Sequence, residues 1–244
     1  MEPVIGDFSV VYPPEEYYRK VGEICCRYGL LFIGDEVTTG FGRSGKLFAS
    51  EDWDPRPDIL CLGKTISGGY VPLAATMATA AVYERFIGAD NVFRHGTTHS
   101  GHPVSAAVGL AAIDIILREE LPQHAARIGA YFQSRLAELQ YKQELIGDVR
   151  GRGLMIALEL VKDRATKEPL ADAETYDIGL DAILRGMWFS ISKNCVRFFP
   201  PLIIDEIFVD EVVAIIDKSL ATGLTAGIGR KARLARELVR AKFA

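Results

Sequence analysis

The sequence predicts an α/β fold that is followed by a smaller α+β domain. Over residues 13–79, helical patterns alternate with short apolar runs, which is typical of a layered α/β protein. From about residue 120 this alternation stops, and long helical patterns stand beside paired strand patterns. The 244 residues are enough for one large domain or two modest ones. We therefore expect a first domain portion over 1–118, a small domain over 119–222 and a basic tail over 223–244.

The first portion begins with a helical pattern over residues 13–29. Pro13 and Pro14 can open this helix, and Gly29 can close it. The apolar run that follows, 30–34, is too short for a helix and is typical of a buried parallel strand. Further elements are expected as strands at 58–63 and 73–79 and as a small-residue helix at 104–117.

The small domain is expected to contain three helices and several strands. The helices are predicted near 121–140, near 172–185 and over about 205–221, with strands around 147–161 and through 188–199. The last helix has an apolar face made of Val209, Val212, Val213, Ile216 and Leu220. In the tail after it, basic residues face a single acid, Glu237, and we interpret this tail as a solvated terminal helix rather than a membrane- or partner-binding segment.

The composition excludes several classes of protein. With 49% apolar and 25% charged residues, the chain has the balance of an ordinary soluble globular protein. A formal charge of −4 provides no general basic surface for nucleic acid. No apolar run approaches the roughly 20 residues of a membrane span, and the first residues lack the pattern of a secretion signal. Four cysteines without CxxC pairing favour a reducing cytoplasm.

Two motifs that could bind phosphate or metal lack the context they need. Gly63-Lys64-Thr65 resembles the end of a P-loop, but Asp58 stands where that loop requires a glycine. His95, His99 and His102 lie in a glycine-broken segment, which should not present them on one helix face. We therefore expect a hydrogen-bonding loop at these histidines and no metal site.

Asp35 and Lys64 form a stronger combination, because each follows an apolar strand pattern. Ligands of open α/β sheets gather at the carboxyl ends of the strands. A lone aspartate there is usually a cap or a loop brace, and a lone lysine is usually a solvated charge. Together they suit a cofactor that needs both a nucleophilic amine and an anionic partner. Pyridoxal phosphate is such a cofactor.

The segment 31–45 reads LFIGDEVTTGFGRSG, which resembles the signature of the class-III pyridoxal-phosphate aminotransferases. Further matches follow in the family's order, namely PDI at 57–59, GKTISGGYVPL at 63–73, HGTTHSGHP at 95–103, VRGRGLM at 149–155 and VRFFPPL at 196–202. The resemblance covers residues 2–221 and looks closest to the omega-amino acid:pyruvate branch. It implies that 1–118 is part of the large domain of a fold-type I transferase.

The resemblance also assigns roles to individual residues. Lys64 matches the lysine that forms a Schiff base with the cofactor and then moves the substrate proton. Asp35 matches the carboxylate paired with the pyridinium nitrogen, and Val37 matches the apolar residue against one ring face. Thr98 matches a threonine that reaches the cofactor phosphate of the other subunit in the family's homodimer. Arg197 resembles an arginine that pairs with an acid or with a substrate carboxylate.

The function that the resemblance implies is amino-group transfer between an amine or omega-amino acid and a 2-oxo acid such as pyruvate. Family members carry a long portion before the segment that matches Glu2, so we expect the chain to correspond to their carboxyl-terminal half and its activity to be impaired. One alternative is an aminomutase or decarboxylase on the same scaffold. Another is an inactive fragment that binds no cofactor.

Overall fold

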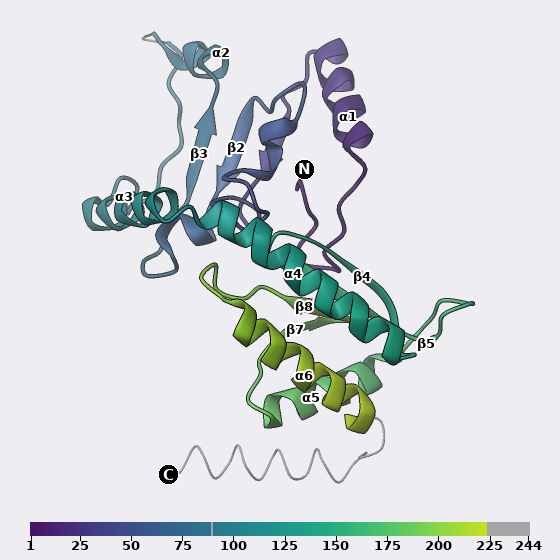
Figure 1. The fold of residues 1–244 in the computed structure, drawn as a ribbon. Helices are drawn as coiled ribbons and strands as arrows, with labels where there is room; N and C mark the ends of the chain where they lie inside the picture. Colours follow the sequence, from purple (N-terminus) through teal and green to yellow (C-terminus); the bar gives the residue numbers. More distant parts are fainter. Residues whose placement is uncertain (89, 224–244) are drawn as a thin grey trace. The chain divides into compact units, whose positions relative to one another are not determined.

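The computed structural model describes residues 1–88 and 90–223, and it divides the chain into two compact units (Figure 1). Unit 1 comprises Met1–Gly6 and Tyr12–Ala126, and unit 2 comprises Asp7–Val11 and the residues from Arg127 onward. The boundary between the units therefore lies between Ala126 and Arg127, inside a helix, whereas the sequence predicts the domain limit at 118. All of the predicted basic tail over 223–244 except its first residue lies outside the described residues.

Unit 1 contains a three-stranded sheet in the order β1-β2-β3. β1 and β2 are parallel, and β2 and β3 are antiparallel. The elements follow along the chain as α1 (Glu15–Tyr28), β1 (Ile33–Asp35), η1 (Ala49–Asp52), β2 (Ile59–Leu62), η2 (Lys64–Ser67), β3 (Ala75–Ala78), α2 (Ala80–Tyr83), η3 (Glu84–Phe86) and α3 (Pro103–Arg118).

The structure confirms the helix predicted at 13–29, which begins two residues later as α1. Pro14 precedes its first turn, where Glu15 and Glu16 face the positive end of the helix dipole. Gly29 closes the helix with φ of 64°, a left-handed conformation that glycine adopts without steric cost.

The strand predicted at 30–34 lies further along the chain, at Ile33–Asp35. The backbone N–H of Leu30 donates to Cys25 O at 2.9 Å, so the end of α1 engages this residue before a strand can start. Parallel pairing with β2 is confirmed, but the prediction of full burial is wrong. Leu30 and Leu31 are 57% and 56% exposed, because burial of a parallel strand requires layers on both faces of its sheet.

An aromatic cluster forms a core of unit 1 between α1 and the strand ends. The ring of Trp53 stacks on Tyr18 with centroids 4.3 Å apart and on Phe32 with centroids 5.3 Å apart. All three side chains are buried, and Val21 and Cys25 of α1 pack against them. The apolar face of α1 is therefore what joins the helix to the rest of the unit.

Unit 2 holds an antiparallel sheet in the order β4-β5-β8-β7, with β6 paired to β5. It is flanked by helices, as the small-domain pattern predicts. Its elements are α4 (Leu121–Lys142, which begins in unit 1), β4 (Ile146–Arg152), β5 (Met155–Asp163), β6 (Glu168–Pro169), α5 (Asp172–Leu184), β7 (Ser190–Ser192), β8 (Cys195–Phe198) and α6 (Glu206–Gly223).

The core of unit 2 is centred on β5, where Met155, Ile156, Ala157 and Leu158 are fully buried. The predicted apolar face of α6 is confirmed, since Val209, Val213, Ile216 and Leu220 are buried and Val212 is half-buried. α4 comes so close to the turn between β4 and β5 that a Cβ added at Gly129 would meet Gly153 O at 2.0 Å. Glycine is required there by the close approach of two backbones.

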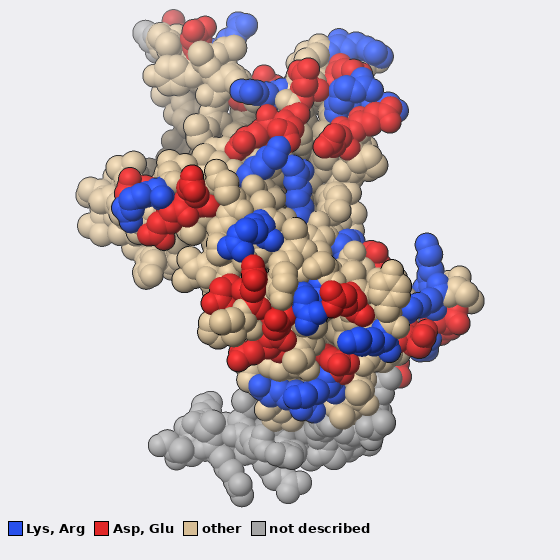
Figure 2. Space-filling view, in the orientation of Figure 1, with Lys and Arg blue, Asp and Glu red and all other residues tan. Residues whose placement is uncertain are grey.

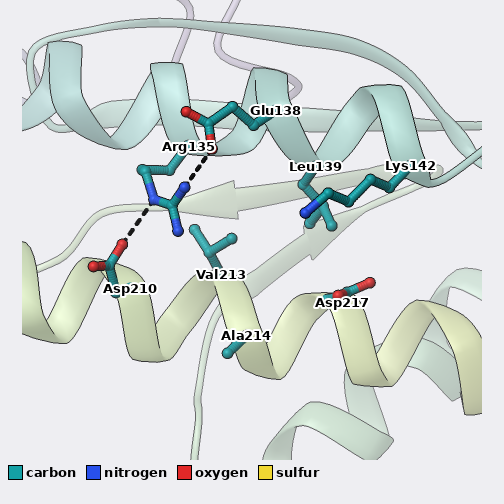
Figure 3. Close-up of a pocket in the computed structure, with 8 residues that line it drawn as sticks. All are labelled: Arg135, Glu138, Leu139, Lys142, Asp210, Val213, Ala214 and Asp217. Atoms are coloured by element: carbon teal, nitrogen blue, oxygen red, sulfur yellow. Dashed lines mark hydrogen bonds and ion pairs between the residues drawn. The ribbon is translucent and has the colours of Figure 1, made fainter.

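Ion pairs join α4 to α6 at the surface of unit 2. Figure 3 shows Arg135 of α4 reaching Asp210 of α6 at 2.8 Å and also contacting Glu138 on its own helix. Figure 2 shows cationic and anionic side chains interspersed over the visible face, with much of the region around β3 uncharged. Within the described ranges, the helices are too short or too polar to cross a lipid bilayer.

Candidate functional site

The structure places Asp35 and Lys64 at neighbouring strand ends in unit 1. Asp35 is the last residue of β1, and it lies opposite Cys61 in the parallel ladder with β2. Lys64 follows Leu62, the last residue of β2, by two positions and opens η2. Because the two strands run parallel, their carboxyl ends share one edge of the sheet. An amine and a carboxylate are thus presented at the place where α/β proteins bind ligands.

Lys64 has an unusual backbone conformation for a residue with a side chain. Its φ is 47°, which is in the left-handed region that favours glycine. Such a conformation costs about 1–3 kcal/mol and tends to occur at functional sites. The side chain is exposed, and its Nζ donates a hydrogen bond to Thr38 Oγ1. This contact places the amine against the loop that follows β1.

The loop after β1 brings further groups to the lysine. Asp35 is half-buried, and its Oδ1 accepts a hydrogen bond from the backbone N–H of Val37 at 3.0 Å. Val37 in turn lies against Gly63, where an added Cβ would approach Val37 Cγ1 to 3.3 Å. The half-buried Val37 side chain therefore lies beside the residue that precedes Lys64.

Thr98 is not brought to this group by the contacts in the structure. It lies in a segment, 91–102, whose described residues are all exposed. Its neighbour Thr97 bonds Ser100 Oγ at 3.0 Å through both its backbone N–H and its hydroxyl. Among the described residues, Thr98 makes no hydrogen bond to Lys64 or Asp35.

Among the histidines of this segment, the structure shows a hydrogen bond to the ring of His102. His102 Nδ1 accepts from the backbone N–H of Ser105 at 3.3 Å and so caps the start of α3. His99 lies with its ring centroid 6.3 Å from that of His102. Over residues 1–88 and 90–223, no three His, Cys, Asp or Glu side chains gather as a metal site would require.

Arg197 belongs to unit 2, where it lies in β8. Its Nη2 donates to Ser190 Oγ at 2.6 Å, its Nη1 donates to the backbone carbonyl of Asp7, and its Cζ lies 6.0 Å from the centre of the Phe199 ring. The contact with Asp7 is made to its backbone carbonyl. These groups border a cavity of about 310 Å³ whose walls include Trp188, Phe189 and Pro201.

The donor set at the strand ends fits pyridoxal phosphate. Lys64 provides a primary amine that can bond an aldehyde, and Asp35 provides a carboxylate that can hold a proton on a ring nitrogen. Val37 provides an apolar side chain that can pack on the face of a ring. The hydrogen bond from Lys64 to Thr38 places the amine at the loop that also carries Val37 and directly follows Asp35.

Comparison with known proteins finds close relatives along most of the chain. The sequence model of the family "Aminotransferase class-III" matches residues 1–220. A taurine–pyruvate aminotransferase from Bilophila wadsworthia is 37% identical over 91% of this chain and 51% of its own length. A leucine/methionine racemase from Thermococcus litoralis is 36% identical over 95% of this chain and 51% of its own length.

A solved structure has the same fold as this chain. An amine transaminase from an uncultivated Pseudomonas species, in its PLP-bound form, superimposes with a TM-score of 0.86 and 39% identity. The superposition covers 90% of this chain and 51% of that structure. The chain therefore spans about half the length of the relatives it matches.

Proposed function

The chain belongs to the class-III aminotransferase family, and from that premise we propose that its first unit binds pyridoxal 5′-phosphate through Lys64 and Asp35 for amino-group transfer. Its fold is that of the fold-type I pyridoxal-phosphate transaminases. The observation that carries the proposal is the placement of an amine and a carboxylate at the carboxyl ends of two adjacent parallel strands.

Each residue of the group has a distinct chemical task. Pyridoxal phosphate, when bound, supplies an aldehyde for covalent attachment and a ring that withdraws electrons from the substrate carbon. The Lys64 amine would hold the cofactor and would take and return the proton at the substrate carbon. The Asp35 carboxylate holds a proton on the ring nitrogen, which keeps the ring electron-withdrawing. Val37 packs against the ring face and orients it.

The proposal extends to the substrates, the assembly and the location of the protein in the cell. We propose an amine or omega-amino acid as donor and a 2-oxo acid such as pyruvate as acceptor, which the similarity to a taurine–pyruvate aminotransferase supports. We assign Arg197 to a carboxylate of the substrate, since it is the cation in the wall of the unit 2 cavity. We also propose a cytoplasmic homodimer in which Thr98 reaches the cofactor phosphate of the other subunit. The exposed position of Thr98 supports this last role.

One relative favours a second candidate function on the same residues. The similarity to a leucine/methionine racemase indicates that proton transfer at the substrate carbon can serve a reaction without amino transfer. The two are distinguished by incubation with an amine and pyruvate. Transfer produces alanine in proportion to the amine consumed, whereas racemisation leaves the pyruvate untouched.

Covalent trapping on the lysine tests the proposed function directly. The purified chain is mixed with pyridoxal phosphate, followed by visible absorbance, reduced with borohydride and mapped by peptide mass. We expect the reduced adduct on Lys64 in the wild type, and we expect Lys64→Ala to lose it. Lys20→Ala is the matched control, because Lys20 lies exposed on α1, in a salt bridge with Glu16. Absence of an adduct, or labelling spread evenly over surface lysines, would refute cofactor binding and favour the inactive fragment.

A further inference from the structure

Glu36 is a buried carboxylate directly beside the candidate site, and the proposed function gives it no task. Its side chain is completely inaccessible to solvent. Oε1 accepts the backbone N–H of Ser50 at 2.7 Å, and Oε2 accepts the backbone N–H of Ala49 at 3.2 Å and the hydroxyl of Thr39. A buried charge is tolerated only with such partners. All three groups donate hydrogen bonds to the carboxylate, so this position requires a side chain that accepts hydrogen bonds.

The backbone of Glu36 is tied as firmly as its side chain. Its N–H donates to Cys61 O at 2.9 Å, and its carbonyl accepts the N–H of Gly40 at 2.9 Å. A Cβ at Gly40 would lie 2.8 Å from that carbonyl, so glycine permits the tight turn. Glu36 therefore connects the end of β2, the loop 36–40 and the start of η1 through one residue.

These ties determine where the functional groups lie relative to one another. Cys61 precedes Lys64 by three residues, and Thr38, which accepts the Lys64 hydrogen bond, lies inside the loop that Glu36 fastens. Asp35 precedes Glu36 and is oriented by the N–H of Val37 in the same loop. A loop held at only one end would leave the amine and the carboxylate free to drift apart by more than the roughly 0.5 Å that a functional site tolerates.

We propose that Glu36 is a positioning residue, whose buried carboxylate holds Thr38 against the Lys64 amine and Asp35 in register with it. It acts through these residues and touches neither substrate nor cofactor. The inference deepens the proposed function and rests on it for its biological meaning. The hydrogen bonds that Glu36 accepts and the hydrogen bond from Lys64 to Thr38, however, are properties of the protein alone and are measurable without cofactor.

Glu36→Gln isolates this role because it keeps the size of the side chain. The amide oxygen can still accept from Ser50, but the amide NH₂ then faces the N–H of Ala49, which can only donate, and the hydroxyl of Thr39 loses the carboxylate to which it donates. We expect the loop 36–40 to shift and the Thr38–Lys64 hydrogen bond to be lost. Glu51→Gln is the matched control, since Glu51 caps the same η1 by accepting the N–H of Phe48 at 2.8 Å but is exposed.

The test measures how fast each lysine of the intact chain is reductively methylated by formaldehyde and cyanoborohydride between pH 7 and 10. Peptide mass mapping gives the rate at Lys64, with Lys20 as internal reference. In Glu36→Gln we expect Lys64 to react about fivefold faster, as loss of one ordinary hydrogen bond predicts, with Lys20 unchanged. Glu51→Gln should leave both rates as in the wild type. Equal acceleration of every lysine would indicate that Glu36→Gln has unfolded, and the Thr39→Val variant then decides the test.

Two further results complete the design. Should Glu36→Gln fail to fold, Thr39→Val removes a single donor from the carboxylate and should accelerate Lys64 in the same direction by a smaller factor. An unchanged rate of Lys64 methylation in a folded Glu36→Gln or Thr39→Val variant would contradict the proposal. A selective change at Lys64 in a chain whose wild type shows no borohydride-trapped pyridoxal phosphate refutes the proposed function instead and leaves the positioning role standing.

Discussion

The charge of Asp35 can be removed without removing the hydrogen bond that orients its side chain. In Asp35→Asn the amide oxygen can still accept the N–H of Val37, which the carboxylate accepts at 3.0 Å. The variant loses only the anion that would hold the ring proton. We expect its dissociation constant for pyridoxal phosphate, measured by visible titration, to rise about tenfold to hundredfold, because hydrogen bonds to charged groups contribute about 1.5–3 kcal/mol.

Asp58→Asn is the appropriate comparison for this measurement. Asp58 is also half-buried and accepts a backbone N–H, that of Phe32 at 2.8 Å, but it lies at the opposite end of β2. We expect it to affect the free energy of unfolding as much as Asp35→Asn does, with unchanged cofactor affinity. Equal affinities in the two variants would show that Asp35 has no special part in binding.

The sequence predicts some residues of the candidate site better than others. Asp35 and Lys64 stand next to apolar runs, so a local pattern is enough to place them at strand ends. Glu36 gives no comparable signal, because its partners Ala49 and Ser50 come more than ten residues later and meet it only when the loop folds back. Asp7 contacts Arg197 through its backbone carbonyl. The residue type alone does not predict whether an aspartate accepts a hydrogen bond through its backbone or its side chain.

At the scale of elements, the contact between α4 and α6 depends on a titratable group. The carboxylate of Asp210 accepts hydrogen bonds from Arg135 at 2.8 Å and from Tyr131 at 3.0 Å. The bond from Arg135, followed by that from Tyr131, holds the pKa of Asp210 below its ordinary value. Because the pKa is lower in the folded state, Asp210 stabilises the fold above its unfolded pKa of about 3.9. That stabilisation is lost as the pH falls through the folded pKa.

Asp210→Asn should therefore show a pH-dependent loss of stability. At pH 7 its thermal unfolding midpoint should lie below that of the wild type, and the difference should shrink as the pH falls below about 3.9. High salt should reduce the difference as well, since the pair is exposed and screened by ions. Glu211→Gln, on the next and exposed residue of α6, should leave the midpoint unchanged. A difference that stays constant down to pH 2 would contradict the ion-pair explanation.

The elements themselves are well predicted where one helix face or one capping residue decides them. α1 ends at Gly29 as its glycine indicates, and α6 buries the predicted apolar face. The run at 30–34 was harder to place, because its N-terminal residue serves the end of α1 and its burial depends on neighbouring layers. An apolar run indicates that a segment can be buried. Whether it is buried depends on segments elsewhere in the sequence that pack against it.

At the scale of the whole molecule, unit 1 exposes large apolar side chains on several of its elements. In unit 1, exposed apolar side chains lie on α3 (Val104, Leu110 and Leu117), on β3 and its following helices (Met77, Tyr83 and Phe86) and just before or in β1 (Leu30, Leu31 and Ile33). Apolar patches of more than a few hundred Å² are unusual on monomeric proteins and mark interaction surfaces. We expect the proposed homodimer to form through these apolar side chains of unit 1.

Introducing a single charge on α3 should test whether its exposed apolar side chains form an interface. Leu110 is 70% exposed, and Ile207 on α6 of unit 2 is equally exposed at 72%. A lysine at an apolar contact must be desolvated on association, whereas a lysine on free surface stays hydrated. We expect Leu110→Lys to weaken self-association of the chain about tenfold or more in sedimentation equilibrium, as substitution at an interface centre does. Ile207→Lys should leave the association constant unchanged, and a wild-type chain that stays monomeric at every concentration would refute the dimer.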